Sequence, residues 1–269
     1  MRSHPRTPRP DPVRIATWNV NSLTARLARV EEWIAYAQPD VLCLQETKQA
    51  DVAFPHGAFA ALGYESAHHG DGRWNGVAII SRVGLDRVST GMGSEHDAEG
   101  TRLIAADCGG ARIVSVYVPN GRALDDPHYP AKLAWLGRLR EFLDETTSSD
   151  QPLAVCGDFN VAPEDRDVWD PSQLDGMTHV SEPERAALAE LEAWGLVDVF
   201  RRCYPDDRLF SWWDYRGGSF HRHRGMRIDL ILATEVLAER TSFALIDRQA
   251  RKGEKPSDHT PVFIDTSVE

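Results

Sequence analysis

The chain has 269 residues, of which 42% are hydrophobic and 26% charged, and its formal net charge is −11 at pH 7. This length and apolar content allow a large buried core, and the acidic balance argues against bulk electrostatic attraction to nucleic acid. No apolar run reaches 18 residues and no segment has the pattern of a signal peptide, so neither a membrane span nor secretion is predicted. Four scattered cysteines, without C-x-x-C or disulfide-framework spacing, predict reduced thiols and a cytoplasmic protein.

The first twelve residues differ in composition from the rest of the chain. They contain four prolines together with Arg2, Arg6 and Arg9. We therefore predict that residues 1–12 form a disordered tail that buries nothing. No linker rich in Pro, Gly or Ser divides the remaining sequence, so we expect residues 13–269 to fold as one domain.

Two predicted strands near the N-terminus end in polar side chains. Residues 13–18 alternate like a strand and lead into Asn19, and residues 40–44 form an apolar run that leads into Glu46. Between them, apolar residues at helical spacing predict a helix over residues 27–38. Asn19 is a candidate metal ligand, and a turn-forming asparagine is the alternative.

The middle of the chain predicts a strand at residues 75–80, a hairpin at residues 101–118 and a helix at residues 132–145. The hairpin turns at two successive glycines, and its second arm ends in Tyr117, three residues before Asn120. Tyr117 by itself fits either half-buried packing in a strand or a place in a polar site.

The segment Leu153–Cys156 is long enough for a buried strand and too short for a helix, and it breaks at Gly157. If the extended geometry continues, Asp158 and Asn160 project from the same face of the strand, because side chains alternate with a period of two. Gly-Asp-x-Asn also makes ordinary turns, in which Asp and Asn bond their own backbone. Both interpretations remain open from this segment alone.

Residues 181–184, Ser-Glu-Pro-Glu, form a capping box that predicts the start of a helix, which Gly195 ends. The sequence then becomes aromatic and basic. Between Arg201 and Arg227 it carries seven arginines and three aspartates, a local charge of +4. Aromatic rings beside arginines are typical of a nucleic-acid face, where rings stack and guanidinium groups hold phosphate. A solvated charged loop is the alternative.

The last part of the chain predicts a strand from Met226 to Ala233, which places Arg227 and Asp229 on one face by parity. An aspartate within such an apolar strand needs a partner, because a buried unpaired carboxylate is costly. The neighbours Asp258 and His259 then come just before a final short strand.

Alternation of strands and helices early, with hairpins later, predicts a mixed α/β sandwich with helices outside two sheets. The polar strand ends would converge at one rim. Hard oxygen ligands there suit Mg²⁺ or Mn²⁺ far better than zinc, and they are Asn19, Glu46, Asp158, Asn160 and Asp258. No zinc-ligand spacing, P-loop or G-x-S-x-G motif occurs.

As a set, these segments resemble the exonuclease III family of apurinic/apyrimidinic (AP) endonucleases, within the wider endonuclease/exonuclease/phosphatase group. The resemblance extends from Val13 to about Asp265 and rests, in chain order, on WNVNSL, PDVLCLQETK, NGVAI, YVPNG, GDFN, WGLVDVFR, FSWWDYR, RGMRIDLIL and PSDHTPV. It implies a four-layer α/β sandwich in which two mixed sheets pack face to face. It also implies Mg²⁺-dependent hydrolysis of DNA 5′ to an abasic site, often with 3′-to-5′ exonuclease and 3′-phosphatase activity.

The resemblance also implies roles for individual residues. Glu46 resembles the principal metal ligand, and the full expected metal set is Asn19, Glu46, Asp158, Asn160, Asp258 and His259. Asp158 would manage the proton of the attacking water or of the leaving group, and the expected catalytic set is Tyr117, Asp158, Asn160, Asp229 and His259. The expected DNA-binding residues are Asn120, Trp212, Arg216, Arg222, Arg224, Met226 and Ile228, among which Trp212, Met226 and Ile228 match positions that line the pocket for the baseless sugar.

The acid that orients His259 can be argued from the sequence. Asp258 is its immediate neighbour and points to the opposite face in extended chain, whereas Asp229 arrives from another strand and lacks another evident partner. We therefore predict an Asp229–His259 pair, with Asp258 facing the metal. Two positions depart from the family pattern, since Val199 replaces the usual Ser or Thr and His223 replaces the usual Asn.

The sequence thus favours a cytoplasmic, monomeric enzyme that works at the nucleoid on double-stranded DNA with abasic sites or 3′ ends. A phosphodiesterase or phosphatase of the same fold, acting on RNA or on a phosphorylated small molecule, is an alternative that the acidic net charge favours. A non-catalytic DNA-binding module is a further alternative. The acidic metal site argues against it, because a protein that only binds DNA has no use for carboxylates facing phosphate.

Overall fold

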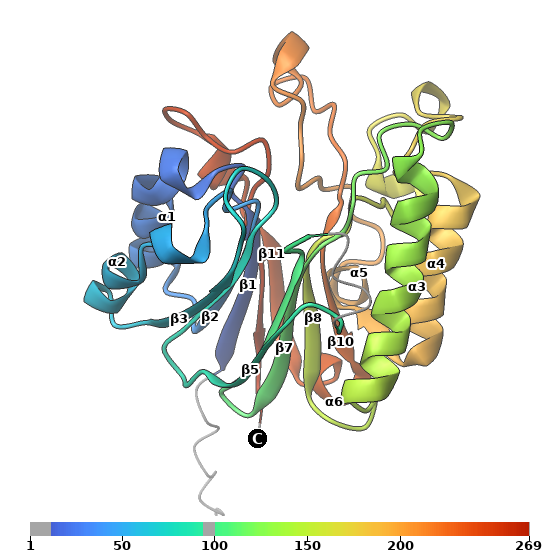
Figure 1. Ribbon diagram of the computed structural model, residues 1–269. Coiled ribbons are helices and arrows are strands. Elements are labelled where there is room, and N and C mark those ends of the chain that lie inside the picture. Colours follow the sequence, from blue (N-terminus) through green and yellow to red (C-terminus); the bar gives the residue numbers. More distant parts are fainter. Residues whose placement is uncertain (1–11, 94–99, 269) are drawn as a thin grey trace, which may run out of the picture.

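The computed structural model describes residues 12–93 and 100–268. Within these ranges the strands form two six-stranded sheets, and helices cover the outer surfaces of both (Figure 1). Apolar side chains from the two sheets interlock in one buried cluster, to which Ile15, Cys43, Ile113 and Ile231 belong. The four-layer α/β sandwich predicted from the sequence is confirmed. The predicted tail at residues 1–12 lies, except for Pro12, outside the described residues.

In the first sheet only β1 and β2 are parallel neighbours, and the other pairs are antiparallel. Its strands in spatial order are β11 (Thr241–Ile246), β12 (Val262–Thr266), β1 (Val13–Asn19), β2 (Val41–Gln45), β4 (Val77–Ser81) and β3 (Glu65–His69). The second sheet repeats this plan, with β7 and β8 as its parallel pair. Its strands are β5 (Asp86–Thr90), β6 (Leu103–Cys108), β7 (Ala111–Tyr117), β8 (Leu153–Asp158), β10 (Asp229–Thr234) and β9 (Leu196–Asp198).

The larger helices pack on the outer faces through their apolar stripes. The first sheet is covered by α1 and α2, and the second by α3 and α4 (Figure 1). The helices are α1 (Leu23–Ala37), α2 (His56–Ala61), α3 (His128–Thr146), α4 (Glu182–Trp194), α5 (Val199–Cys203) and α6 (Glu235–Ala238). Among the described residues, no helix combines the length and apolar character needed to cross a membrane.

Local sequence signals explain where the helices begin and end. In α1 the buried residues Val30, Trp33, Ile34 and Ala37 recur at helical spacing, and Pro39 prevents a further turn. In α4 the predicted capping box is present, since the side chain of Ser181 accepts from the backbone of the third helical residue and that residue's carboxylate accepts from the backbone of Ser181. Each of these two side chains therefore satisfies a backbone N–H group that the start of the helix leaves unpaired.

The structure corrects the boundary of the predicted strand at residues 226–233. This strand, β10, begins only at Asp229, because Met226 instead bridges Trp212 and Val168. Arg227 therefore precedes the strand, and the parity argument does not apply to it. Its guanidinium is buried in ion pairs with Asp167 and Asp198.

Several short elements received no prediction from the sequence. All five residues of β5 are exposed, so it lacks the apolar alternation that marks a half-buried strand. The same weakness of signal applies to the other elements that the sequence left unassigned, which are α2, β3, β9, α5, α6 and β11.

One rim of the sandwich collects the polar strand ends. The parallel strands β1, β2, β7 and β8 end there, and the antiparallel strands β10 and β12 begin there. The register places Asn19 beside Gln45, and it places Asp158 beside both Tyr117 and Asp229. The convergence predicted from the sequence therefore follows from the order and direction of the strands.

Candidate active site

Asn19, at the end of β1, connects acidic residues from the two sheets. Its side-chain nitrogen Nδ2 donates to Oε1 of Glu46 at 2.8 Å and to Oδ2 of Asp158 at 2.9 Å. Its Oδ1 accepts from the backbone nitrogen of Asn21 at 3.0 Å, which fixes the orientation of the amide. Two carboxylates from different sheets therefore share one buried donor.

Glu46, Asp158 and His259 form the candidate metal site among the described residues. One ligand atom from each can be chosen so that all lie within 4.8 Å of one another. Carboxylate oxygens are the ligands that Mg²⁺ and Mn²⁺ prefer. The ammonium of Lys48 lies 2.8 Å from Oε2 of Glu46, so a positive charge is already accommodated beside this acid. The residues present thus fit a hard divalent cation.

The two acids differ in their electrostatic environment. Burial favours the protonated form of Glu46, but the charge and hydrogen bond of Lys48 outweigh this and lower its pKa. Burial raises the pKa of Asp158, and the nearby positive charge of His259 only partly opposes that effect. Asp158 is therefore the better proton acceptor, and Glu46 is the acid that stays ionised.

His259 is held by an acid from the second sheet. Its Nδ1 lies 2.8 Å from Oδ2 of Asp229, and its Nε2 lies 3.7 Å from Oδ2 of Asp158. Burial alone would lower the pKa of His259, but the negative charges of Asp229 and Asp158 raise it to about 10. The contact between Asp229 and His259 that the sequence predicted is present, and it directs Nε2 toward the site.

Asp258 has different partners from those that the sequence suggested. Its Oδ1 accepts from Nδ2 of Asn21 at 3.0 Å, and its Oδ2 accepts from Nε1 of Trp212 at 3.2 Å. It lies outside the group formed by the ligand atoms of Glu46, Asp158 and His259. Asp258 thus meets an amide and an indole, whereas its neighbour His259 contacts Asp229 and Asp158.

Asn160 does not continue the strand that ends at Asp158. Its backbone is left-handed, with φ of 50°, and its backbone nitrogen donates to Oδ1 of Asp158 at 2.9 Å. The turn interpretation of Gly-Asp-x-Asn is therefore correct, and the shared-face interpretation is wrong. The Asn160 amide donates to the carbonyl of Val118 at 2.9 Å and accepts from Asn120 at 3.1 Å.

A buried ion pair that was not predicted from the sequence lies next to these asparagines. Lys132 and Glu184 are both fully buried and are in contact. The Lys132 ammonium also donates to the backbone carbonyl of Asn160 at 2.6 Å and to that of Asn120 at 3.3 Å. The signal was a lysine at the start of the apolar stripe that continues through Trp135, since a charge on a core-facing stripe requires a buried partner.

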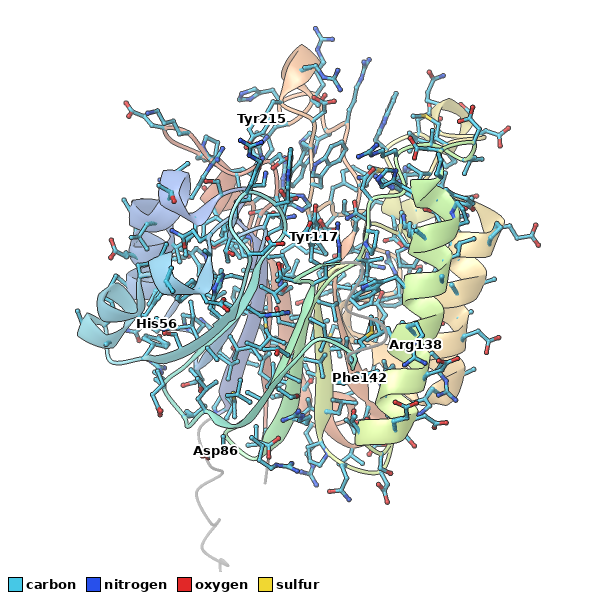
Figure 2. The ribbon with its side chains drawn as sticks, in the orientation of Figure 1. His56, Asp86, Tyr117, Arg138, Phe142 and Tyr215 are labelled. Atoms are coloured by element: carbon cyan, nitrogen blue, oxygen red, sulfur yellow. The ribbon has the colours of Figure 1, made fainter. Side chains whose placement is uncertain are left out.

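Tyr117 completes the rim from the end of β7, and Figure 2 shows it near the upper ends of the sheets. Burial, followed by the negative charges of Glu46 and Asp158, raises the pKa of its hydroxyl well above the ordinary value. The Arg102 guanidinium lies over the ring at 4.6 Å from its centre. The hydroxyl therefore stays protonated and can act as a hydrogen-bond donor.

Comparisons with known proteins identify the family to which this geometry belongs. Residues 16–259 match the model of the Endonuclease/Exonuclease/phosphatase family. Exodeoxyribonuclease III of Haemophilus influenzae is 34% identical over 265 residues, covering 94% of this chain and 99% of that protein. The chain belongs to the endonuclease/exonuclease/phosphatase family. The resemblance inferred from the sequence motifs is confirmed.

Solved structures agree with the family assignment. An AP endonuclease from Archaeoglobus fulgidus superposes with a TM-score of 0.91 at 40% identity, covering 95% of this chain and 99% of that chain. A 3′-5′ exonuclease (NExo) from Neisseria meningitidis superposes with a TM-score of 0.91 at 38% identity, covering 95% of this chain and 100% of that chain.

In this family member, a partly apolar wall of side chains lies beside the candidate active site. Met226 and Ile228 are buried in a small cluster with Val168, and Trp212 packs partly buried against it. Trp212, Met226 and Ile228, which the sequence grouped, therefore belong to one cluster. The cluster adjoins His259, because the backbone of Trp212 forms a bridge with it.

The predicted DNA-binding arginines occur on a loop that projects beyond the rim, near the labelled Tyr215 in Figure 2. Arg216 pairs with Asp214 at 2.7 Å, and Arg224 lies over the ring of Trp169 at 5.0 Å. Within the described part of the chain, the exposed side chain of Arg222 has no partner. These arginines therefore differ in how firmly they are held.

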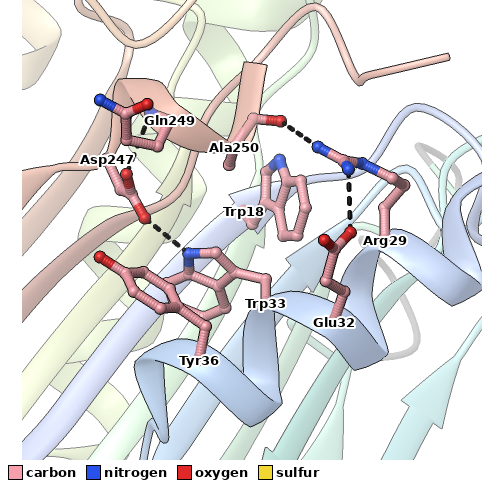
Figure 3. A pocket seen from close by; sticks show the side chains of 8 residues that line it. All are labelled: Trp18, Arg29, Glu32, Trp33, Tyr36, Asp247, Gln249 and Ala250. Carbon is pink, nitrogen blue, oxygen red and sulfur yellow. Dashed lines mark hydrogen bonds and ion pairs between the residues drawn. The ribbon is translucent and has the colours of Figure 1, made fainter. Parts of the chain in front are cut away.

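A separate hollow of about 180 Å³ lies between α1 and the segment Arg248–Arg251 (Figure 3). Trp18 and Trp33 line it, and Nε1 of Trp33 donates to Asp247. Because its aspartate is already bonded and no second acid stands free there, this hollow does not compete with the rim as a site of chemistry.

Proposed function

We propose that this protein is a metal-dependent DNA-repair phosphodiesterase that cleaves DNA 5′ to abasic sites and also acts on 3′ ends as an exonuclease and phosphatase. The observation that carries the proposal is the grouping of Glu46, Asp158 and His259 within 4.8 Å beside a tryptophan-lined wall. Carboxylates and a histidine around one point suit the hydrolysis of a phosphodiester, in which negative charge develops on the phosphoryl oxygens.

The relatives support DNA as the substrate. A Neisseria structure 38% identical to this chain is described as a 3′ phosphatase (NExo) bound to a product DNA hairpin, and the Archaeoglobus relative is described as an AP endonuclease. Relatives of nearly equal similarity thus carry different activities. For this chain, the apolar wall at Trp212 supports the abasic endonuclease, because a baseless sugar can pack on a surface that excludes polar base edges.

Glu46 and Asp158 would hold the metal, which we propose is Mg²⁺, with Mn²⁺ as a substitute. When bound, the cation would stabilise negative charge on the phosphoryl oxygens. Glu46 suits this role because its pKa is lowered and it stays ionised. Asn19, in bonding to both acids, would keep their oxygens turned toward one point.

The chain's own groups supply the proton chemistry. Asp158, whose pKa burial raises, would take the proton of the attacking water. His259, kept protonated by Asp229, would donate from Nε2 to a phosphate oxygen, and the Tyr117 hydroxyl would donate to another. Asn160 and Asn120, supported from below by Lys132, would orient the phosphate or the water.

Charge gives the strongest support to an alternative substrate. A net charge of −11 repels a polyanion and so favours a small phosphorylated molecule over a DNA duplex. However, salt screens charges beyond a Debye length of about 8 Å at physiological ionic strength, so local arginines can dominate binding. We therefore favour duplex DNA with an abasic site or a 3′ end, bound by a monomer in the cytoplasm at the nucleoid.

A duplex with one tetrahydrofuran abasic analogue tests the proposed function. We expect a single cut 5′ to the analogue with Mg²⁺, and no cut with EDTA. A matched intact duplex and an RNA strand serve as substrate controls. Cleavage of RNA or of a small phosphate ester, without cleavage of the abasic duplex, would support the alternative, and binding without any cleavage would indicate a non-catalytic module.

Two substitutions should impair this reaction in different ways. Asp158→Asn removes the proton acceptor as well as a ligand oxygen, so even at saturating Mg²⁺ it should lower kcat by about 10²- to 10⁴-fold, the usual scale for general acid–base catalysis, with DNA still bound. Glu46→Ala should mainly raise the Mg²⁺ concentration needed for half of the maximal rate. Rates measured across a Mg²⁺ titration separate these effects, and wild-type Mg²⁺ dependence in Glu46→Ala contradicts its assignment as a ligand.

The projecting loop should determine how binding depends on salt. Changing Arg222 and Arg224 together to Ala should weaken abasic and intact duplex alike and flatten the plot of log K against log[salt] by about one unit per lost phosphate contact. Trp212→Ala should weaken abasic duplex selectively and leave the slope unchanged.

A control for this experiment is Arg240→Ala. Arg240 precedes β11 at the end of the sheet opposite the rim, so its loss changes the net charge without touching the loop. Should the double arginine variant keep the wild-type slope, the loop is only solvated and DNA binds elsewhere.

A further inference from the structure

The segment that carries Glu46 has an unusual backbone. Glu46 and Lys48 both have left-handed conformations, with φ of 51° and 52°. Residues other than glycine and asparagine rarely adopt the left-handed backbone conformation, so surrounding contacts must hold the backbone in it. The residue between them, Thr47, is fully buried. Its contacts can therefore help to fix the backbone from which the Glu46 side chain projects.

Backbone hydrogen bonds hold this segment from two sides. The backbone nitrogen of Ser22 donates to the carbonyl of Glu46 at 2.7 Å, on the side of α1. On the other side, the backbone nitrogen of Thr47 donates to Gly76 at 3.1 Å and that of Lys48 donates to Asn75 at 3.0 Å. These bonds place the chain, but none of them reaches a side chain of the segment.

The Thr47 side chain makes a connection of another kind. Its hydroxyl Oγ1 lies 2.8 Å from Nε2 of His68, and Nδ1 of the same ring lies 2.8 Å from Oδ1 of Asp51. The ring of His68 stacks on Phe54 at 4.3 Å between centres. Hydroxyl, imidazole and carboxylate therefore form one hydrogen-bonded line that ends next to Glu46.

The direction of the hydrogen bonds follows from the environment of His68. Burial lowers the pKa of its ring to about 4, although Asp51 opposes this effect. The ring is therefore neutral at neutral pH. It donates from Nδ1 to the carboxylate of Asp51 and accepts at Nε2 from the hydroxyl of Thr47.

This line resembles a hydrolase triad in its distances but cannot act as one, because the Thr47 side chain is fully buried and no substrate can reach it. The space for the Thr47 hydroxyl depends on the adjacent residue Gly76. A Cβ atom at Gly76 would lie 2.1 Å from Oγ1 of Thr47, so this position must remain a glycine if the hydroxyl is to keep its place. The geometry is that of a support for the backbone beside Glu46.

We propose that Thr47, His68 and Asp51 act as positioning residues that hold Glu46 in the orientation required for metal binding. The proposal rests on the proposed function of Glu46 as a metal ligand. Outer groups that orient a ligand commonly contribute about 10- to 100-fold to metal affinity or activity. None of the three residues would touch substrate or metal.

Binding of Mn²⁺ alone, measured by electron paramagnetic resonance on the full chain, tests the proposal without reference to turnover. Thr47→Val keeps the shape of the side chain and removes the hydroxyl, so we expect Mn²⁺ affinity to fall by about 10-fold or more. Thr47→Ser keeps the hydroxyl and should retain affinity close to the wild type. His68→Phe, which keeps the stacking on Phe54, should behave like Thr47→Val.

The residues should also act as a unit. The double variant Thr47→Val/His68→Phe should bind Mn²⁺ no more weakly than the worse single variant, because the first change already breaks the line. Gly76→Ala should reproduce the loss by displacing the hydroxyl. His56→Phe is the matched control, since His56 also lies against Phe54 but bonds to Ser66, and its affinity should stay at the wild-type level.

The outcomes separate this proposal from the one on which it rests. If Glu46→Ala weakens Mn²⁺ binding and Thr47→Val does not, the positioning role is wrong and the metal site stands. If Glu46→Ala itself binds Mn²⁺ as the wild type does, the metal assignment fails. Equal losses in Thr47→Ser and Thr47→Val would also overturn the proposal, because the hydroxyl would then not be the cause. Asp51→Asn, at a largely exposed carboxylate, should weaken Mn²⁺ binding in the same direction as Thr47→Val, and unchanged affinity would remove Asp51 from the positioning group.

Discussion

The hydrogen bonds from Asn19 to Glu46 and Asp158 are the interaction on which the site depends. Two carboxylates that approach each other in a buried place repel, and each loses hydration. The Asn19 amide offsets part of this cost by donating to both. Because Glu46 follows a strand of the first sheet and Asp158 ends a strand of the second, the site exists only while the two sheets keep their packing.

The contacts beneath the site reinforce this requirement. Gln45 accepts from the hydroxyl of Thr17 in its own sheet and donates to the hydroxyl of Ser115 in the other, so a buried polar chain crosses the apolar interface directly below the rim. Polar groups buried in this way must meet their partners in one geometry, since an unpaired one is costly. The sandwich therefore fixes the sheet-to-sheet position from which the acids project.

Much of the site could be predicted because its residues obey simple rules. Asn19, Glu46, Tyr117 and Asp158 follow apolar runs, which made the strand ends visible. The Asp229–His259 contact followed from the cost of an unpaired carboxylate in an apolar strand.

The parts that could not be predicted depend on backbone turns and on contacts distant in sequence. Asn160 itself has a left-handed backbone, and the two-residue alternation of side chains no longer applies where a strand ends. The partners of Asp258 and of Arg227 come from loops whose paths no periodicity describes. Lys132 was visible within a predicted helix, which the structure begins earlier, at His128, and Glu184 was visible in a capping box, but only the packing of α3 on α4 brings them together. His68 lies on a short strand without alternation and gave no signal at all.

We propose that Glu46 and Asp158, joined through Asn19, hold a divalent cation at the rim. Anomalous diffraction from crystals of the protein soaked in Mn²⁺ tests it most directly. We expect an anomalous peak about 2 Å from carboxylate oxygens of Glu46 and Asp158, the distance that hard cations of this size require. A strong peak elsewhere in the molecule, with no density between these two acids, would contradict it.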